Sequence, residues 1–267
     1  MVKILAIANQ KGGVGKTTTS INLAASLARM QKRVLLVDLD PQGNATMGCG
    51  VEKSSLDQSV YDVLTGQCEA AKAIVPAGNN GFMVLPSNSD LTAAEVELLD
   101  FENKEARLKS ALQTVAANYD YILIDCPPSL NMLTLNALVA AHRVLIPMQC
   151  EYFALEGLSA LSETISAIAG SVNKSLVIEG LVRTMFDPRN KLTQEVSQQL
   201  KQHFGDQVFR TVIPRNVRLA EAPSYGLPII EYDKTSSGAL AYLALAGELI
   251  RRDSGQTSEM AQDNNGS

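Results

Sequence analysis

The chain has 267 residues, of which 46% are hydrophobic and 19% are charged, and its formal net charge is -5. This composition is that of an ordinary globular protein, long enough to bury a full core. No run of about 18 consecutive apolar residues is present, which excludes a membrane-spanning helix. The four cysteines are scattered without a C-x-x-C pair, so a disulfide framework or zinc site is not expected, and a reducing cytoplasm fits best.

Short apolar runs alternate with helix-like segments along the chain. The predicted strands, rich in Val, Ile and Leu as expected for strands buried on both faces, are Lys3–Ala8, Arg33–Asp38, Phe82–Pro86, Tyr121–Asp125, Arg143–Met148 and Val177–Thr184. The predicted helices are Thr17–Met30, Leu91–Leu99, Lys104–Asn118, Met132–Ala141, Leu155–Gly170, Leu192–Phe204 and Ser237–Arg252. This alternation predicts an α/β fold, a single-domain, doubly wound and mostly parallel sheet with helices on both faces.

No internal repeat and no Pro/Gly/Ser-rich linker divides the chain. Residues 1–252 are therefore interpreted as one domain. Residues 253–267 are polar, small and acidic, and we expect them to form a disordered tail.

The loop after the first strand carries the strongest motif of the chain. Its residues are Lys11, Gly12, Gly13, Val14, Gly15, Lys16, Thr17 and Thr18. The glycines let backbone N–H groups curl around phosphate oxygens at a helix N-terminus, while Lys16 neutralises phosphate charge and Thr17 ligates Mg²⁺. The loop departs from the G-x-x-x-x-G-K-[ST] pattern, because Gln10 replaces the first glycine and Lys11 is added. The alternative is a glycine-rich turn with incidental lysines.

Carboxylates follow two further predicted strands. Asp38 and Asp40 end the second strand, and in an extended chain both would point to the same side, toward a ligand at the carboxyl edge of the sheet. Asp125 ends the apolar strand Tyr121–Asp125, as a Walker B carboxylate that holds Mg²⁺ does. An aspartate at a strand end can also simply cap a turn. Cys126 is interpreted as a small buried residue rather than a nucleophile, since no histidine lies nearby in the sequence.

Positive charge is concentrated in one stretch of this acidic chain. Residues 181–220 contain seven Lys/Arg and three acidic residues, which leaves a net charge of -9 for the rest. Such a stretch can bind phosphates because salt limits the reach of distant charges to about 8 Å. A solvated surface with additional arginines is the alternative.

Five segments together resemble a known family. They are Lys11–Thr18, Asp38–Asn44, Ile124–Pro128, Gln149–Leu158 and Val212–Arg218. In these the chain is similar to the ParA/Soj chromosome-partitioning ATPases, members of the deviant Walker A group of P-loop NTPases to which MinD and the nitrogenase iron protein are related. The resemblance runs from residue 2 to about residue 250, and it is to the short form, without an N-terminal helix-turn-helix domain.

The resemblance implies ATP and Mg²⁺ as cofactors and a catalytic set of Lys11, Lys16 and Asp40. Lys11 matches the lysine that reaches across a nucleotide-sandwich homodimer to the partner's phosphates, and Gly12 matches the glycine that permits this close approach. Asp40 matches the carboxylate that orients or activates the attacking water. The implied metal set is Thr17, Asp38 and Asp125.

The resemblance also implies contacts outside the loop. Pro214 and Asn216 match residues of the adenine pocket, and Arg189 and Arg218 match arginines that bind double-stranded DNA non-specifically. A ParB-like centromere-binding protein is the implied partner, and a cytoplasmic, nucleoid-associated location follows. Lys191 departs from the family, which more often has a neutral residue there, and it is either a phosphate contact or a solvated residue at a helix start.

Three other functions fit the superfamily. A MinD-like membrane ATPase needs a basic amphipathic C-terminal helix, whereas Gly238–Ile250 is mainly Ala and Leu, so we expect no stable membrane association. A metal or iron–sulfur carrier needs bridging cysteine pairs, which are absent from this sequence. A ParA-like ATPase that positions another cargo stays open, because only the partner differs.

Overall fold

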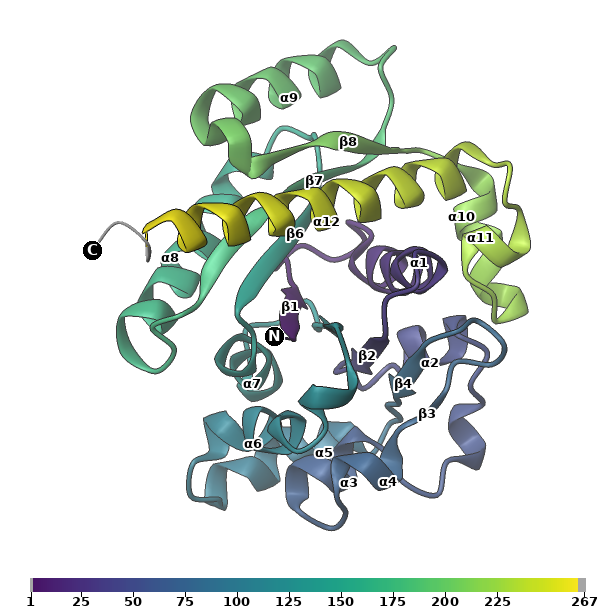
Figure 1. Cartoon of the computed structure of the whole chain (residues 1–267), viewed down its shortest axis with the longest axis vertical. Helices are drawn as coiled ribbons and strands as arrows, with labels where there is room; N and C mark the ends of the chain where they lie inside the picture. Colours follow the sequence, from purple (N-terminus) through teal and green to yellow (C-terminus); the bar gives the residue numbers. More distant parts are fainter. Residues whose placement is uncertain (1, 264–267) are drawn as a thin grey trace.

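The computed structural model describes residues 2–263, in which one sheet carries helices on both faces (Figure 1). The strands are β1 Lys3–Ile7, β2 Val34–Asp38, β3 Val75–Pro76, β4 Met83–Leu85, β5 Tyr121–Asp125, β6 Arg143–Gln149, β7 Val177–Phe186 and β8 Val208–Pro214. Within the described residues they form one eight-stranded sheet in the order β3-β4-β2-β5-β1-β6-β7-β8. Every neighbouring pair is parallel except β3 with β4, which confirms the predicted fold class.

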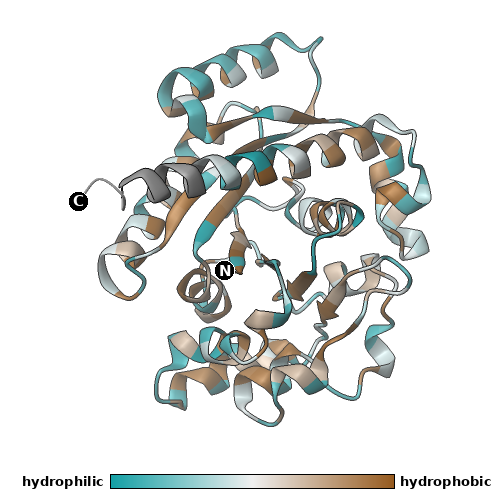
Figure 2. Ribbon diagram, in the orientation of Figure 1, coloured by the Kyte–Doolittle hydropathy of each residue, from teal (hydrophilic) through white to brown (hydrophobic). Residues whose placement is uncertain are grey.

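Two hydrophobic clusters, one on each face of the sheet, hold the helices. The helices are α1 Lys16–Arg29, α2 Asn44–Gly48, α3 Val60–Thr65, α4 Ala70–Ala73, α5 Leu91–Glu97, α6 Arg107–Gln113, α7 Met132–Ala140, α8 Ala154–Ser171, α9 Lys191–Phe204, α10 Val217–Glu221, α11 Ile229–Tyr232 and α12 Ser237–Asp263. Helices α3 to α9 contribute to one cluster, and α1, α2 and α10 to α12 contribute to the other. Figure 2 shows that α7 is mostly hydrophobic, whereas α9 is mostly hydrophilic.

Strand β1 lies at the point where the sheet reverses its order. Its spatial neighbours are β5 and β6, while the next strand in sequence, β2, lies beyond β5. In open α/β sheets such a switch point leaves a crevice at the carboxyl ends of the strands, where ligands bind. The loop after β1 and the carboxylates that end β2 and β5 therefore meet at this edge.

Two strands and several helices differ from the sequence prediction, and the short helices α2, α3, α4, α10 and α11 were not predicted. Strands β3 and β8 were not expected, because β3 has only two residues and the edge strand β8 includes Arg210 and Thr211 in place of a continuous apolar run. The helix predicted over Lys104–Asn118 is also shorter. Only α6 is α-helical there, and a single 3₁₀ turn lies on either side of it.

Helix α12 continues beyond the predicted end at Arg252. Residues 253–263 of the expected tail are helical, and residues 264–267 lie outside the described part of the chain. Asp253 is buried, accepts a 2.5 Å hydrogen bond from the Tyr121 hydroxyl and forms a 2.5 Å ion pair with Lys3. The sequence places the end of this helix too early, because an aspartate that follows two arginines is typical of a solvent-exposed helix end. The residues that bind Asp253 lie far from it in the sequence, so they could not be recognised there.

Candidate functional site

The loop between β1 and α1 has the backbone shape that its glycines predict. Gly13 and Gly15 adopt positive φ angles of 73° and 85°, a region that other residues rarely enter. Gly15 is the N-cap of α1, whose first amides carry the partial positive charge of a helix N-terminus. The loop therefore presents backbone donors to an anion at the switch point.

Neighbouring strands fix this loop in place. The Thr184 hydroxyl of β7 donates a 2.7 Å hydrogen bond to the Val14 carbonyl. The Asn9 amide donates to the Pro147 carbonyl of β6 at 2.8 Å, and its oxygen accepts from the Lys11 backbone N–H at 2.9 Å. The loop is thus pre-shaped for its ligand by residues of two other strands.

Lys16 lies beneath the loop with 7% of its surface exposed. Its ammonium donates a 3.2 Å hydrogen bond to the Lys11 carbonyl. Burial lowers the pKa of Lys16, and attraction to Asp125 offsets part of this effect. A desolvated ammonium beside an open loop is well suited to meet a phosphate anion.

Asp125 is the buried carboxylate closest to this lysine and has an unused oxygen. Its Oδ1 accepts a 2.8 Å hydrogen bond from the Ser20 hydroxyl, while its Oδ2 is buried without a partner. The pKa of Asp125 is raised to about 7, mainly by burial and also by the nearby Asp38, while the Ser20 and Thr17 hydroxyls act in the opposite direction. An orphaned carboxylate oxygen near a threonine hydroxyl is a donor set that fits Mg²⁺, which also takes ligands from phosphates and water.

The two aspartates at the end of β2, Asp38 and Asp40, have different surroundings. Asp38 is fully buried, and its oxygens accept hydrogen bonds from the Asp40 amide and from the amide and hydroxyl of Thr46. Burial raises the pKa of Asp38 to about 6. Asp40 lies beyond the strand end and lines the cavity beside the loop. Asp38 thus holds the loop that positions Asp40, and direct metal ligation by Asp38 stays a prediction.

Two adjoining cavities, each of about 320 Å³, meet at the loop. The first is polar and is lined by Gly12, Gly13, Gly15, Lys16, Thr17, Thr18, Asp40, Asn44, Pro128 and Met185. The second is mostly apolar and is lined by Pro214, Asn216, Ile213, Val217, Leu219, Tyr242 and six further residues. They share Gly15, Thr18 and Met185, so one ligand with phosphates and a flat base can span both.

Pro214 and Asn216 therefore line the apolar cavity, as their predicted role requires. The Asn216 side chain already has structural partners, because its oxygen caps α10 and its amide donates to the Ser237 hydroxyl at 2.7 Å. Its predicted contact with a base stays a prediction.

Gly12 lines the polar cavity, and both Gly12 and the preceding Lys11 are exposed. The Lys11 ammonium forms an ion pair with Glu151, which follows β6. A Cβ atom added to Gly12 would meet no other atom within 4 Å. A side chain at position 12 would therefore meet no other part of the single chain.

The predicted DNA contacts are exposed but paired. Arg189 is bound to Asp187 at 2.9 Å. Arg218 lies 2.9 Å from Glu221. Lys191, the departure from the family pattern, lies 3.7 Å from Glu195 on α9. These carboxylate partners were not predicted from the sequence, and neither were the supporting roles of Ser20, Thr46, Thr184, Met185 and Glu151. The helical spacing of Ser20 from Lys16 was the one available signal.

The fold and this site together define a P-loop nucleotide hydrolase. The AAA domain family matches residues 2–178 of the chain. The chain is 54% identical over 249 residues to the sporulation initiation inhibitor protein Soj of Bacillus subtilis, covering 93% of this chain and 98% of that protein. It is 52% identical over 251 residues to the chromosome partitioning protein ParA of Myxococcus xanthus, covering 94% and 89%. The chain belongs to the ParA/Soj family of chromosome-partitioning ATPases.

Solved structures agree with this assignment. Cobyrinic acid a,c-diamide synthase of Mycobacterium smegmatis, with bound ADP and magnesium, is 39% identical with a TM-score of 0.83, covering 94% of this chain and 95% of that one. The septum site-determining protein MinD of Pyrococcus horikoshii, complexed with Mg-ADP, is 25% identical with a TM-score of 0.78, covering 93% and 96%. Between residues 2 and 263, no helix has the length and apolarity needed to span a bilayer.

Proposed function

We propose that this ATPase is a DNA-segregation switch in which ATP drives a homodimer that binds DNA without regard to sequence. The observation that carries this proposal is that Gly12 lines the phosphate cavity with free space around it, next to the exposed Lys11. Relatives at 52–54% identity are named for chromosome partitioning and sporulation control, and this supports segregation over the synthase named for the 39% identical structure.

ATP and Mg²⁺ are its cofactors. The loop amides and Lys16 bind the phosphates, and the apolar cavity beside Pro214 takes the base. Thr17 and Asp125 would hold Mg²⁺, with Asp38 behind them. When bound, the ion offsets charge on the phosphates. Asp40 is placed to orient the attacking water, because it lines the same cavity as Lys16.

Two chains then face each other across their nucleotides. In the dimer Lys11 leaves Glu151 and reaches the phosphates of the partner, and Gly12 allows the two loops to approach. Arg189 and Arg218 bind DNA phosphates from the basic stretch. A ParB-like centromere-binding protein stimulates hydrolysis and releases the DNA, which places the protein on the nucleoid in the cytoplasm. A slow ATPase suits this cycle, since the bound state must persist until it is reset.

DNA binding with ATP, ADP or no nucleotide, across a salt series, tests the proposal. We expect unrelated duplexes to bind only with ATP, and to bind less tightly as salt rises. Arg218→Ala removes a predicted DNA contact, whereas Arg29→Ala changes an exposed arginine on α1 and serves as the matched control. Sequence-specific binding, or equal binding without ATP, would overturn the proposal. Flotation with liposomes in the presence of ATP is the test for a membrane-associated function.

A further inference from the structure

A second basic hollow lies on the side of β7 and β8 that faces α9, apart from the phosphate cavity. Its volume is about 460 Å³. We call it the α9 groove, after its polar lining residues Arg183, Gln194, Ser197, Gln198, Lys201 and Arg210; the other two lining residues are apolar. None of the lining residues carries a carboxylate, and Arg183, Lys201 and Arg210 are cationic.

Arg183 forms the floor of the α9 groove and is 3% exposed. Its guanidinium donates to the Ser197 hydroxyl at 2.8 Å and to the carbonyls of Phe209 and Arg210 at 2.8 and 3.1 Å. Its Nε is buried without a partner. Among the described residues, Arg183 forms no ion pair with any carboxylate. A buried charge is normally paired, because desolvation of a lone ion is costly.

The geometry of strand β8 and helix α9 brings further hydrogen-bond donors beside this arginine. Phe209 faces α12, where the Arg252 guanidinium lies 3.8 Å from its ring centroid. Because side chains alternate along a strand, Arg210 faces the opposite side, toward α9. Gln194, Ser197, Gln198 and Lys201 follow the i, i+3, i+4, i+7 spacing of one helix face. Amide, hydroxyl and cationic groups of two strands and one helix therefore border one groove.

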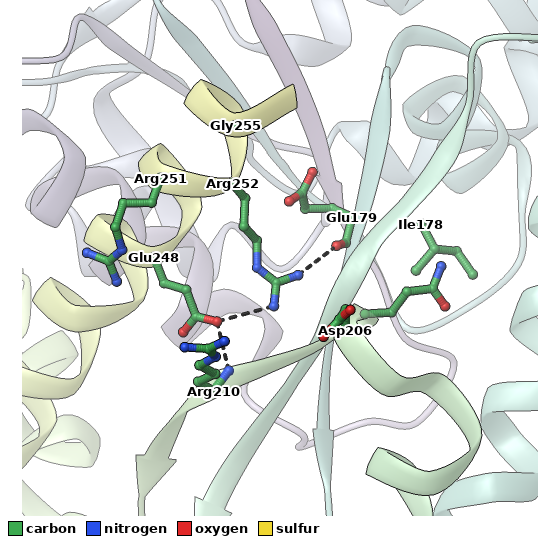
Figure 3. Close-up of a pocket in the computed structure, with 9 residues that line it drawn as sticks. Ile178, Glu179, Asp206, Arg210, Glu248, Arg251, Arg252 and Gly255 are labelled. Atoms are coloured by element: carbon green, nitrogen blue, oxygen red, sulfur yellow. Dashed lines mark hydrogen bonds and ion pairs between the residues drawn. The ribbon is translucent and has the colours of Figure 1, made fainter. Parts of the chain in front are cut away.

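The hollow on the opposite side of β8 is a useful contrast. There, Arg252 donates to the Glu248 carboxylate at 3.2 Å and to the Glu179 carbonyl at 3.4 Å, and Glu248 also accepts from the Arg210 amide at 2.7 Å (Figure 3). Three carboxylates, including that of Asp206, line that hollow together with its arginines. Its carboxylates offset the charges of Arg251 and Arg252, whereas no carboxylate lines the α9 groove, and Arg210 borders both hollows.

We propose that the α9 groove binds a phosphate group, which supplies the negative charge that Arg183, Lys201 and Arg210 lack. Arginines favour phosphate because their planar fork matches its oxygens, and glutamine and serine side chains add neutral donors. The phosphate belongs either to a DNA backbone or to a small phosphorylated molecule. The assignment to DNA rests on the function proposed above, whereas pyrophosphate binding does not, because the site is separate from the P-loop.

Calorimetric titration of the full chain with inorganic pyrophosphate tests this site at low salt. The P-loop is disabled by Lys16→Gln, so that any binding reports on another site. We expect one pyrophosphate to bind per chain, and Lys201→Gln or Arg210→Gln each to weaken binding by about ten-fold through loss of a charged hydrogen bond. Lys174→Gln and Arg29→Gln, exposed cations outside the groove, are the matched controls and should change affinity less than about two-fold.

Arg183→Met gives a second readout. It should abolish pyrophosphate binding and also lower thermal stability, because Ser197 and the carbonyls of Phe209 and Arg210 lose their hydrogen bonds to the guanidinium. If this variant does not fold, the variants at positions 201 and 210 decide the question on their own.

Duplex DNA binding by the same groove variants, with an intact P-loop and ATP, identifies the source of the phosphate. Weaker DNA binding than in the two controls assigns the groove to the DNA backbone, whether or not pyrophosphate binds. Unchanged DNA binding together with weakened pyrophosphate binding assigns it to a small phosphorylated molecule. If neither ligand responds to the groove variants, the proposal is wrong.

Discussion

Lys11 is paired with Glu151 of its own chain, 140 positions away in the sequence. Both side chains are about half exposed, at 47% and 50%. The pair therefore holds, in the single chain, the lysine that the proposed dimer needs at the partner's phosphates. It competes with dimer formation instead of supporting it.

Glu151→Gln should favour the ATP-dependent dimer by removing this competing partner. An exposed ion pair contributes up to about 1 kcal/mol, and the symmetric dimer breaks two of them, which corresponds to at most about 30-fold in the dimerisation constant. Analytical ultracentrifugation with ATP measures the effect, and Glu156→Gln, an exposed residue on the next helix, is the matched control. A weaker dimer in Glu151→Gln would show that this carboxylate acts across the interface.

Gly12→Val should block the dimer without harming the single chain. Gly12 has no positive φ, and an added Cβ would have free space around it, so the thermal midpoint should stay within about 2 °C of the parent. ATP binding to the monomer should persist, while the ATP-dependent dimer is lost. Gly170→Val on α8, where an added Cβ is also free of contacts, is the control. Normal dimerisation by Gly12→Val would remove position 12 from the interface.

Asp40→Asn should separate binding from hydrolysis. The residue lines the phosphate cavity, and its Oδ1 accepts a 2.9 Å hydrogen bond from the Gln42 amide, which an asparagine oxygen can also accept. We expect nucleotide affinity within about three-fold of the parent, and turnover lower by about 100-fold or more, in the range of a lost general base. Equal losses in affinity and turnover would mean that Asp40 only shapes the cavity.

Asp125→Asn should stabilise the nucleotide-free, metal-free protein at high pH. The pKa of Asp125 is raised to about 7 in the folded chain, from about 4 in an unfolded chain. The folded state therefore retains a proton that the unfolded state releases, so stability is full at low pH and is lost as pH rises toward 7. The thermal midpoint of Asp125→Asn should exceed that of the parent by several degrees near pH 8, where the charge is present.

The gain from Asp125→Asn should shrink by at least about half near pH 5, because the parent aspartate is then protonated in the folded chain. ATPase activity should be lost at both pH values. A gain that does not change with pH would assign the effect to packing rather than to the buried charge.

Asp253→Asn should destabilise the fold, although sequence places this residue in a tail. Its carboxylate is the shared partner of Lys3, Arg143 and Tyr121. Breaking a buried pair costs about 3 kcal/mol, or roughly 6 to 12 °C in the thermal midpoint of a chain of this size. Arg251→Gln, an exposed neighbour on α12, is the control. If Asp253→Asn had the same thermal midpoint as the parent, Asp253 would not contribute to the fold and the domain would end at residue 252, as predicted.

The sequence alone determined the features that are local in the chain. The phosphate-binding loop was predictable because its strand, glycines, lysine and helix start lie within about 20 residues, where backbone preferences decide the shape. Strands β1, β2, β4, β5, β6 and β7 were predictable because burial on both faces gives continuous apolar runs.

Only the tertiary structure decided which distant groups meet. Asp38 and Asp125 are register partners on adjacent strands, yet one is saturated with hydrogen bonds and the other keeps an unused oxygen. The Lys11–Glu151 pair and the unpaired charge of Arg183 likewise depend on contacts between separate elements. Burial and electrostatic effects depend on the distance between groups in space. The number of residues between two groups in the sequence does not give that distance, which is fixed only when the strands assemble into the sheet.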